Sequence, residues 1–169
     1  NDGKQLTGEG RTFGFTVTVT TGNNTPVGYE ISAVKDSTST LSNNDVRIYL
    51  EKSTSGAEGT YTSVYEPTGY NPINATTEIG TPAGEMILHS DSTTTTRTDY
   101  YMLRMWVSED YEITGESKFF TIKVNVYGTD SSISSSGISL NKNSLTLDEG
   151  ESEKLIATTT PDYATNKNR

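Results

Sequence analysis

Apolar and polar side chains alternate along several segments of this chain, and no segment shows a helical period. Between residues 12 and 20, one face of an extended strand would carry Phe13, Phe15, Val17 and Val19. Strict alternation is the pattern of a β-strand that buries one face. Further strand patterns lie at 27–34, 46–51, 61–65 and 85–89. We therefore predict an all-β fold, an antiparallel β-sandwich of the jelly-roll or immunoglobulin-like type.

The two most apolar segments, at 99–108 and 119–127, flank an acidic turn. Both are long and present apolar side chains at alternating positions, so we predict that they pair as the central hairpin of the domain. We also predict a weaker strand near Glu78 and a loop at the threonine-rich stretch 92–98.

Composition divides the chain into four parts. Residues 1–11 are polar and rich in Gly, which predicts a flexible leader. Residues 12–128 carry the strand patterns of the sandwich domain. A Ser-rich stretch at 129–137 is typical of a linker, and residues 138–169 form a second, shorter module with strand patterns. A chain of 169 residues suffices for one ordinary domain and a fragment of another.

Charge and residue usage exclude several classes of partner. The formal net charge is -9, whereas nucleic acids and anionic membrane surfaces bind clustered Lys and Arg. The absence of Cys excludes a disulfide framework and a thiolate metal site. No apolar run approaches the ~18 residues of a membrane span. We therefore predict no nucleic-acid partner and no membrane span in this segment.

Recognisable catalytic and metal-binding patterns are missing from the sequence. His89 is the one histidine, and a strand-edge residue facing solvent or a loop is its simplest interpretation. The acidic turn at 109–116 could offer oxygens to Ca²⁺, but it lacks the spacing of a calcium loop. A solvated hairpin tip is the better interpretation of that turn. We predict no enzymatic activity, no catalytic residue, no cofactor and no metal ligand.

Five residues are candidates for ligand or subunit contacts. Tyr100, Arg104 and Trp106 would share one face of the strand at 99–108. That face could be an exposed platform on which a sugar stacks, or it could be covered by a loop or a neighbouring subunit, and we favour the covered alternative. Leu155 and Ile156, in the last module, are candidate subunit contacts.

The C-terminal sequence ISLNKNSLTLDEGESEKLIATTTPDYATNKNR, residues 138–169, resembles the opening part of a bacterial immunoglobulin-like domain of group 2. This resemblance implies a secreted or surface β-sandwich module used as a spacer or adhesive unit. The second half of the family pattern, with its Trp-bearing strand, has no counterpart before Arg169. Because an isolated pair of strands is marginal in water, we expect this partial module to be ordered against a neighbouring subunit.

The strand YYMLRMWVS, followed by an acidic turn and FTIKVNVYG, gives residues 12–128 a second likeness. These segments resemble the secreted TasA and camelysin type of Firmicutes β-sandwich. The resemblance implies a jelly-roll-like fold and assembly into extracellular fibres by strand exchange between subunits.

Together these patterns predict a secreted or surface-exposed bacterial structural protein, a fibre, biofilm-matrix or adhesion subunit that assembles through β-strand pairing. Its partners would be copies of itself or other surface proteins, and its location extracellular or at the cell surface. One alternative is a phage virion or tail protein with a structural or decorating role. A further alternative is a carbohydrate-binding module that uses Trp106 and the tyrosines.

Overall fold

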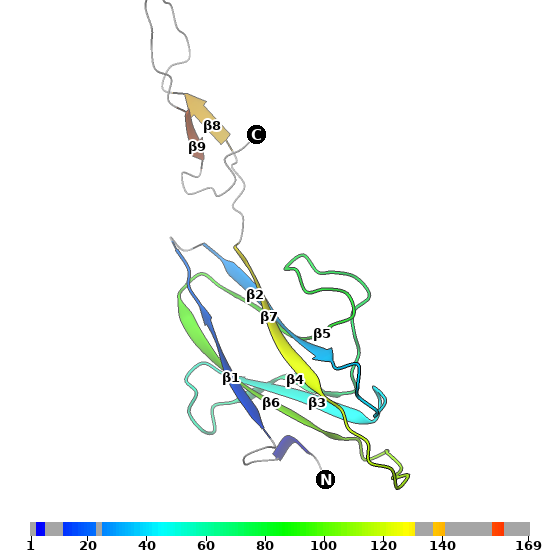
Figure 1. The fold of residues 1–169 in the computed structure, drawn as a ribbon. Coiled ribbons are helices and arrows are strands. Elements are labelled where there is room, and N and C mark those ends of the chain that lie inside the picture. Colours follow the sequence, from blue (N-terminus) through cyan, green and yellow to red (C-terminus); the bar gives the residue numbers. More distant parts are fainter. Residues whose placement is uncertain (1–2, 6–11, 23–24, 131–136, 141–156, 161–169) are drawn as a thin grey trace, which may run out of the picture. The chain divides into compact units, whose positions relative to one another are not determined.

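The structure is a computed structural model, and it describes residues 3–5, 12–22, 25–130, 137–140 and 157–160. The chain forms two compact units, Asn1–Thr129 and Asp130–Arg169. The first unit contains two layers of β-strands (Figure 1).

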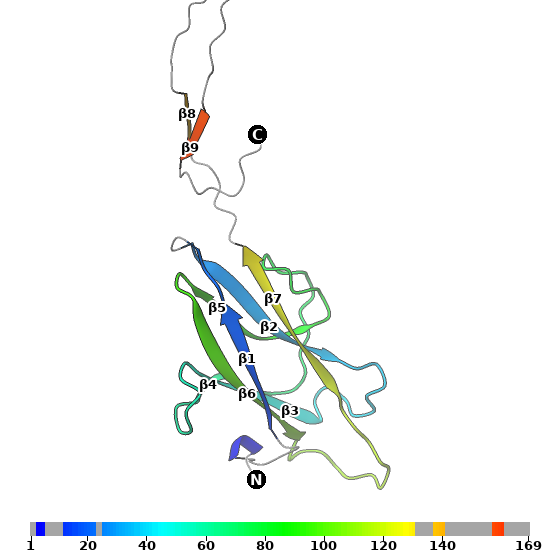
Figure 2. The same ribbon diagram turned by 60° about the vertical axis from the view of Figure 1, so that its left-hand side comes forward.

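The described residues of the first unit form seven strands and a short 3-10 helix, η1 (Gly3–Gln5). The strands are β1 (Phe13–Val19), β2 (Val27–Lys35), β3 (Val46–Ser53), β4 (Thr62–Thr68), β5 (Met86–Thr93), β6 (Arg97–Val107) and β7 (Ile122–Asp130). One sheet has the order β1-β6-β3-β4 and the other the order β5-β2-β7 (Figure 2). The registers of β1 with β6, β2 with β5, β3 with β4 and β3 with β6 are all antiparallel, and the prediction of an all-β sandwich is confirmed.

The predicted hairpin of 99–108 with 119–127 is wrong. β6 lies inside the four-stranded sheet, where Tyr101 is opposite Phe15 of β1 and Leu103 is opposite Leu50 of β3. β7 instead belongs to the other sheet, beside β2. The connection therefore crosses between the layers, and along it Phe119 accepts backbone hydrogen bonds of 2.9 and 3.0 Å from the β2–β3 loop. Both strands have long apolar patterns because each faces the core, from opposite sheets.

Three local predictions also differ from the structure. No strand forms near Glu78, since residues 69–85 are a loop. The expected loop at 92–98 shrinks to 94–96, because β-branched Thr favours strands and β5 and β6 extend into the stretch. Gly3–Gln5, within the predicted flexible leader, form η1, where Gly3 is buried.

The loop at 69–85 covers part of the outer face of the three-stranded sheet. Tyr70 donates its hydroxyl to the carbonyl of Gly84 at 2.9 Å. Thr77 and Thr81 each donate to the carboxylate of Glu30 at 2.6 Å. These contacts supply hydrogen bonds to polar groups that burial removes from water.

The hydrophobic core lies between the sheets and follows the predicted alternation. On β1, Val17 and Val19 are buried, whereas Phe13 on the same face is 54% exposed. The inner faces of the other strands supply most of the remaining core: Tyr29, Ile31, Ala33, Val46, Ile48, Leu50, Met86, Leu88, Tyr101 and Leu103. The core side chains are therefore shielded from solvent along most strands, but the one at the start of β1 is exposed.

In the second unit, β8 (Gly137–Leu140) pairs antiparallel with β9 (Ala157–Thr160). Ile138 lies opposite Thr159 in this pair. Leu155 and Ile156 lie outside the described residues.

Replacing Leu50 with Ala should lower the free energy of unfolding by about 2–5 kcal/mol, because Leu50 is fully buried and a cavity would remain. Denaturant unfolding followed by circular dichroism measures the change. Val126→Ala is the comparison, since Val126 is 46% exposed, and it should cost less than about 1 kcal/mol. Equal losses in both variants would contradict this description of the core.

Candidate functional site

β1 and β7 are the edge strands of the two sheets on one side of the sandwich (Figure 2). Side chains of these strands and of β6 line an apolar groove between them. Its volume is about 710 Å³. The lining side chains come from β1, β6, β7 and the residue before β1: Thr12, Phe13, Phe15, Leu103, Met105, Ile122, Lys123, Val124 and Val126. Most of these are the inward-facing residues of their strands, so the groove is an uncovered part of the core.

Aromatic contacts organise the β1 wall of the groove. The rings of Phe13 and Phe15 lie 5.6 Å apart, and Phe15 stacks on Tyr101 at 5.3 Å. The stack continues the core outward, yet Phe13 is 54% exposed and Val126 on the opposite wall is 46% exposed. Contiguous exposed apolar surface of this kind marks an interaction site in soluble proteins.

The backbones that flank the groove are also available for pairing. Among the described strands, β1 pairs with β6 alone and β7 with β2 alone. Each therefore directs the N–H and C=O groups of its free edge away from its own sheet. Natural edge strands are often protected by Lys or Pro, and β7 carries Lys123, but β1 has the sequence FGFTVTV without either.

This arrangement can bind one extended segment. Such a segment would add backbone hydrogen bonds to an exposed edge and place every second side chain on the apolar floor formed by Leu103 and Met105. A segment that paired with β1 along its whole length would pair with 7 residues, the length of that strand. The groove thus fits a strand with alternating apolar side chains.

The predicted contact residues Tyr100, Arg104 and Trp106 lie on β6, away from this groove. All three are partly buried. Arg104 forms an ion pair with Glu51 of β3. Tyr100 is packed against Gly56, where an added Cβ would lie 2.8 Å from its ring.

Trp106 is covered from the N-terminal side. Gly3 of η1 packs on its indole so closely that a Cβ at Gly3 would lie 2.1 Å from the ring. Tyr49 approaches the same indole edge-on, with ring centroids 6.4 Å apart. Trp106 is thus partly covered by residues of its own chain, and a contact of this face with a ligand or a subunit stays a prediction.

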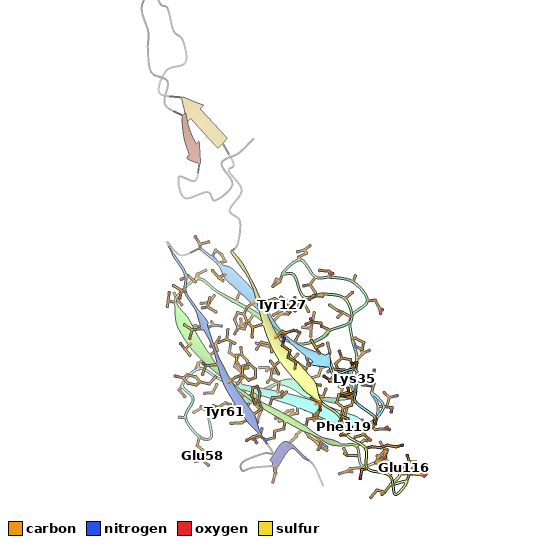
Figure 3. All side chains as sticks on the ribbon, viewed as in Figure 1. Lys35, Glu58, Tyr61, Glu116, Phe119 and Tyr127 are labelled. Atoms are coloured by element: carbon orange, nitrogen blue, oxygen red, sulfur yellow. The ribbon has the colours of Figure 1, made fainter. Side chains whose placement is uncertain are left out.

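The acidic turn projects away from the sandwich, with Glu116 near its tip (Figure 3). Asp110 lies 3.3 Å from Arg47 and is 90% exposed, and Lys118 lies 4.0 Å from Glu116. These contacts are those of a solvated turn with surface ion pairs.

Four charged side chains that the sequence patterns did not single out meet between the sheets: Lys52, Asp91, Arg97 and Asp99. We call this group the inter-sheet clasp. Asp91 of β5 accepts hydrogen bonds from Lys52 of β3 and, at 2.6 Å, from Arg97 of β6. Asp99 lies 3.1 Å from Lys52 and accepts from Arg97 at 3.0 Å. The sequence does contain a signal for this cluster: Lys52 lies two residues after Leu50 and four after Ile48, so it shares their inward face of the strand.

Two tyrosines and the histidine adjoin the clasp. Tyr29 of β2 donates its hydroxyl to Asp99 at 2.7 Å and forms a hydrogen bond with the hydroxyl of Tyr101. His89 Nε2 lies 3.9 Å from Asp91 Oδ2. His89 therefore faces the interior and not solvent, because the register of β5 directs it toward Tyr101, 5.8 Å away between ring centroids.

Comparisons with known proteins identify no relative. No protein-family model matches the chain, and neither a curated protein nor a solved structure matches it. Within the part of the chain that the structure describes, no helix is long and apolar enough to cross a membrane.

A fluorescent dye that reports exposed apolar surface should bind the folded protein in the groove. Val126→Arg should remove most of the fluorescence, because it places a charge on the groove wall. Ile113→Arg is the matched control, since Ile113 is 89% exposed but does not line the groove. Equal dye binding by the two variants would show that the groove is not the dye site.

Proposed function

We propose that this protein is a secreted or surface-exposed structural subunit that assembles into fibres, matrix or adhesive layers through β-strand pairing. The observation that carries the proposal is the apolar groove between two sheet edges. It offers main-chain hydrogen bonds and a side-chain pocket together, the two elements of strand-addition recognition.

The expected occupant is a strand from another copy of the chain. The net charge of -9 makes copies repel one another at long range. The groove lining, however, contains Lys123 and no carboxylate, so an incoming strand of an acidic chain meets no negative charge there. Self-assembly is therefore compatible with the electrostatics at the point of contact.

Burial supplies the driving force for assembly. A fully covered Val or Phe side chain contributes about 1.5–3 kcal/mol relative to an exposed one. Phe13 and Val126 are each about half exposed, so covering them contributes part of that amount, and the occupant's own apolar side chains add to it. The proposal assigns the protein no reaction.

The extracellular location is part of the proposal and is supported by the sequence. Lack of Cys and the group 2 immunoglobulin-like and TasA-like resemblances are all compatible with a bacterial surface protein. Within the first unit, the sandwich supports the TasA-like likeness only at the level of fold class.

Assembly of the purified chain tests the proposal. Wild-type protein should form filaments or oligomers as its concentration rises, seen by negative-stain microscopy and sedimentation. Val126→Arg should raise the concentration required at least about tenfold, because 1.4 kcal/mol is a factor of ten and covering an unpaired guanidinium costs more.

Ile113→Arg adds the same charge outside the groove and should assemble as the wild type does. Thermal melts must show both variants folded. A wild-type chain that remains monomeric throughout, or a Val126→Arg chain that assembles normally, would overturn the proposal.

A further inference from the structure

The inter-sheet clasp joins the two layers by charge. Asp91 stands on the three-stranded sheet, whereas Lys52, Arg97 and Asp99 stand on the four-stranded sheet. The ion pairs of Asp91 therefore cross from one layer to the other. The hydrogen bond from Tyr29 to Asp99 crosses in the opposite direction.

The clasp occupies one end of the interior. On β3, Lys52 lies near the C-terminal end of the strand, whereas the fully buried Ile48 and Leu50 lie earlier on the same face. On β5, Asp91 is likewise separated from the buried Met86. The charged end and the apolar end are thus consecutive stretches of the same strands.

Burial and pairing oppose each other in the clasp. Desolvation alone would raise the pKa of Asp99, but hydrogen bonds from Tyr29, Lys52 and Arg97 outweigh it and hold the pKa below its ordinary value. For Asp91 too, burial acts to raise the pKa, and the contacts with Lys52 lead those that lower it. Both carboxylates are therefore ionised at neutral pH.

At His89, by contrast, burial outweighs pairing and favours the uncharged form. Burial, and then the charge of Lys52, lower its pKa below the ordinary value, although Asp91 partly opposes them. Its Nε2 atom and Oδ1 of Asp99 have no hydrogen-bond partner among the described residues. Tyr29 and Tyr101 have raised pKa values, chiefly through burial, and remain neutral.

We propose that the clasp is an acid-sensitive fastening between the two sheets, which opens this end of the sandwich when Asp91 and Asp99 are protonated while the apolar end stays packed. Protonation would leave Lys52 and Arg97 close together without their counter-charges. Removing one side of a buried ion pair is far more destabilising than never having formed it.

The direction of the pH dependence follows from linkage. A carboxylate with a lowered pKa stabilises the folded state fully above its unfolded value of about 3.9, and this contribution is lost as the pH falls through the folded value. The lowered pKa of His89 means that the unfolded chain takes up a proton first, so stability begins to fall below about pH 6.5. Both effects weaken the clasp in acid.

Hydrogen exchange from pH 7 down to about pH 2, corrected for intrinsic rates, tests the proposal, because carboxylates with lowered pKa values become protonated only in that acid range. Amides of 91–101 should lose protection at higher pH than amides of 46–50, so that an interval of pH exists in which only the first region exchanges rapidly. The single Trp and the single His of the chain give independent signals. The fluorescence of Trp106 should stay constant in the interval where the His89 imidazole resonance shifts.

Asp91→Asn should reduce protection of 91–101 already at pH 7 and flatten its acid dependence. Glu51→Gln is the matched control, since the Glu51 and Arg104 side chains are only 17% and 11% exposed but join β3 and β6 within one sheet. That variant should keep the order of opening. Simultaneous loss of protection in both regions of the wild type, or an unchanged acid midpoint in Asp91→Asn, would overturn the proposal.

Discussion

Each sheet of this protein must bury one face, and a layer of four strands faces a layer of three. Alternation supplies an inner face along the strands, apolar except at the clasp. On the side where β1 and β7 are the edge strands, part of the apolar inner surface has no cover, and this uncovered part is the groove. The groove is thus built from ordinary core-facing residues.

The clasp and the groove are two regions of the sandwich in which different forces hold the sheets together. Charged and hydroxyl groups of β2, β3, β5 and β6 tie the layers together across the clasp. The groove side relies on packing of Phe15, Leu103 and their neighbours. Apolar packing at the groove can adjust to an added strand without separating ions, whereas a change at the clasp would separate paired charges. This difference is compatible with the proposed binding of a strand at the groove.

Much of the fold could be predicted from period-two alternation, because that pattern fixes which side chains share a face. Val17 and Val19, which the pattern places on one face of β1, are both buried. Strand partners could not be predicted in the same way, since β6 and β7 have similar patterns, and alternation does not tell which sheet each strand joins. The groove was equally invisible, because alternation directs Phe13 inward but does not reveal whether another element covers it.

The contact between Gly3 and Trp106 ties the start of the chain to the four-stranded sheet. η1 lies on the indole of β6, the strand to which β1 is paired. A side chain at position 3 would overlap the ring, so only glycine allows η1 to rest there. Because Trp106 is the single tryptophan of the chain, detachment of η1 would expose its indole and change the tryptophan emission of the whole protein.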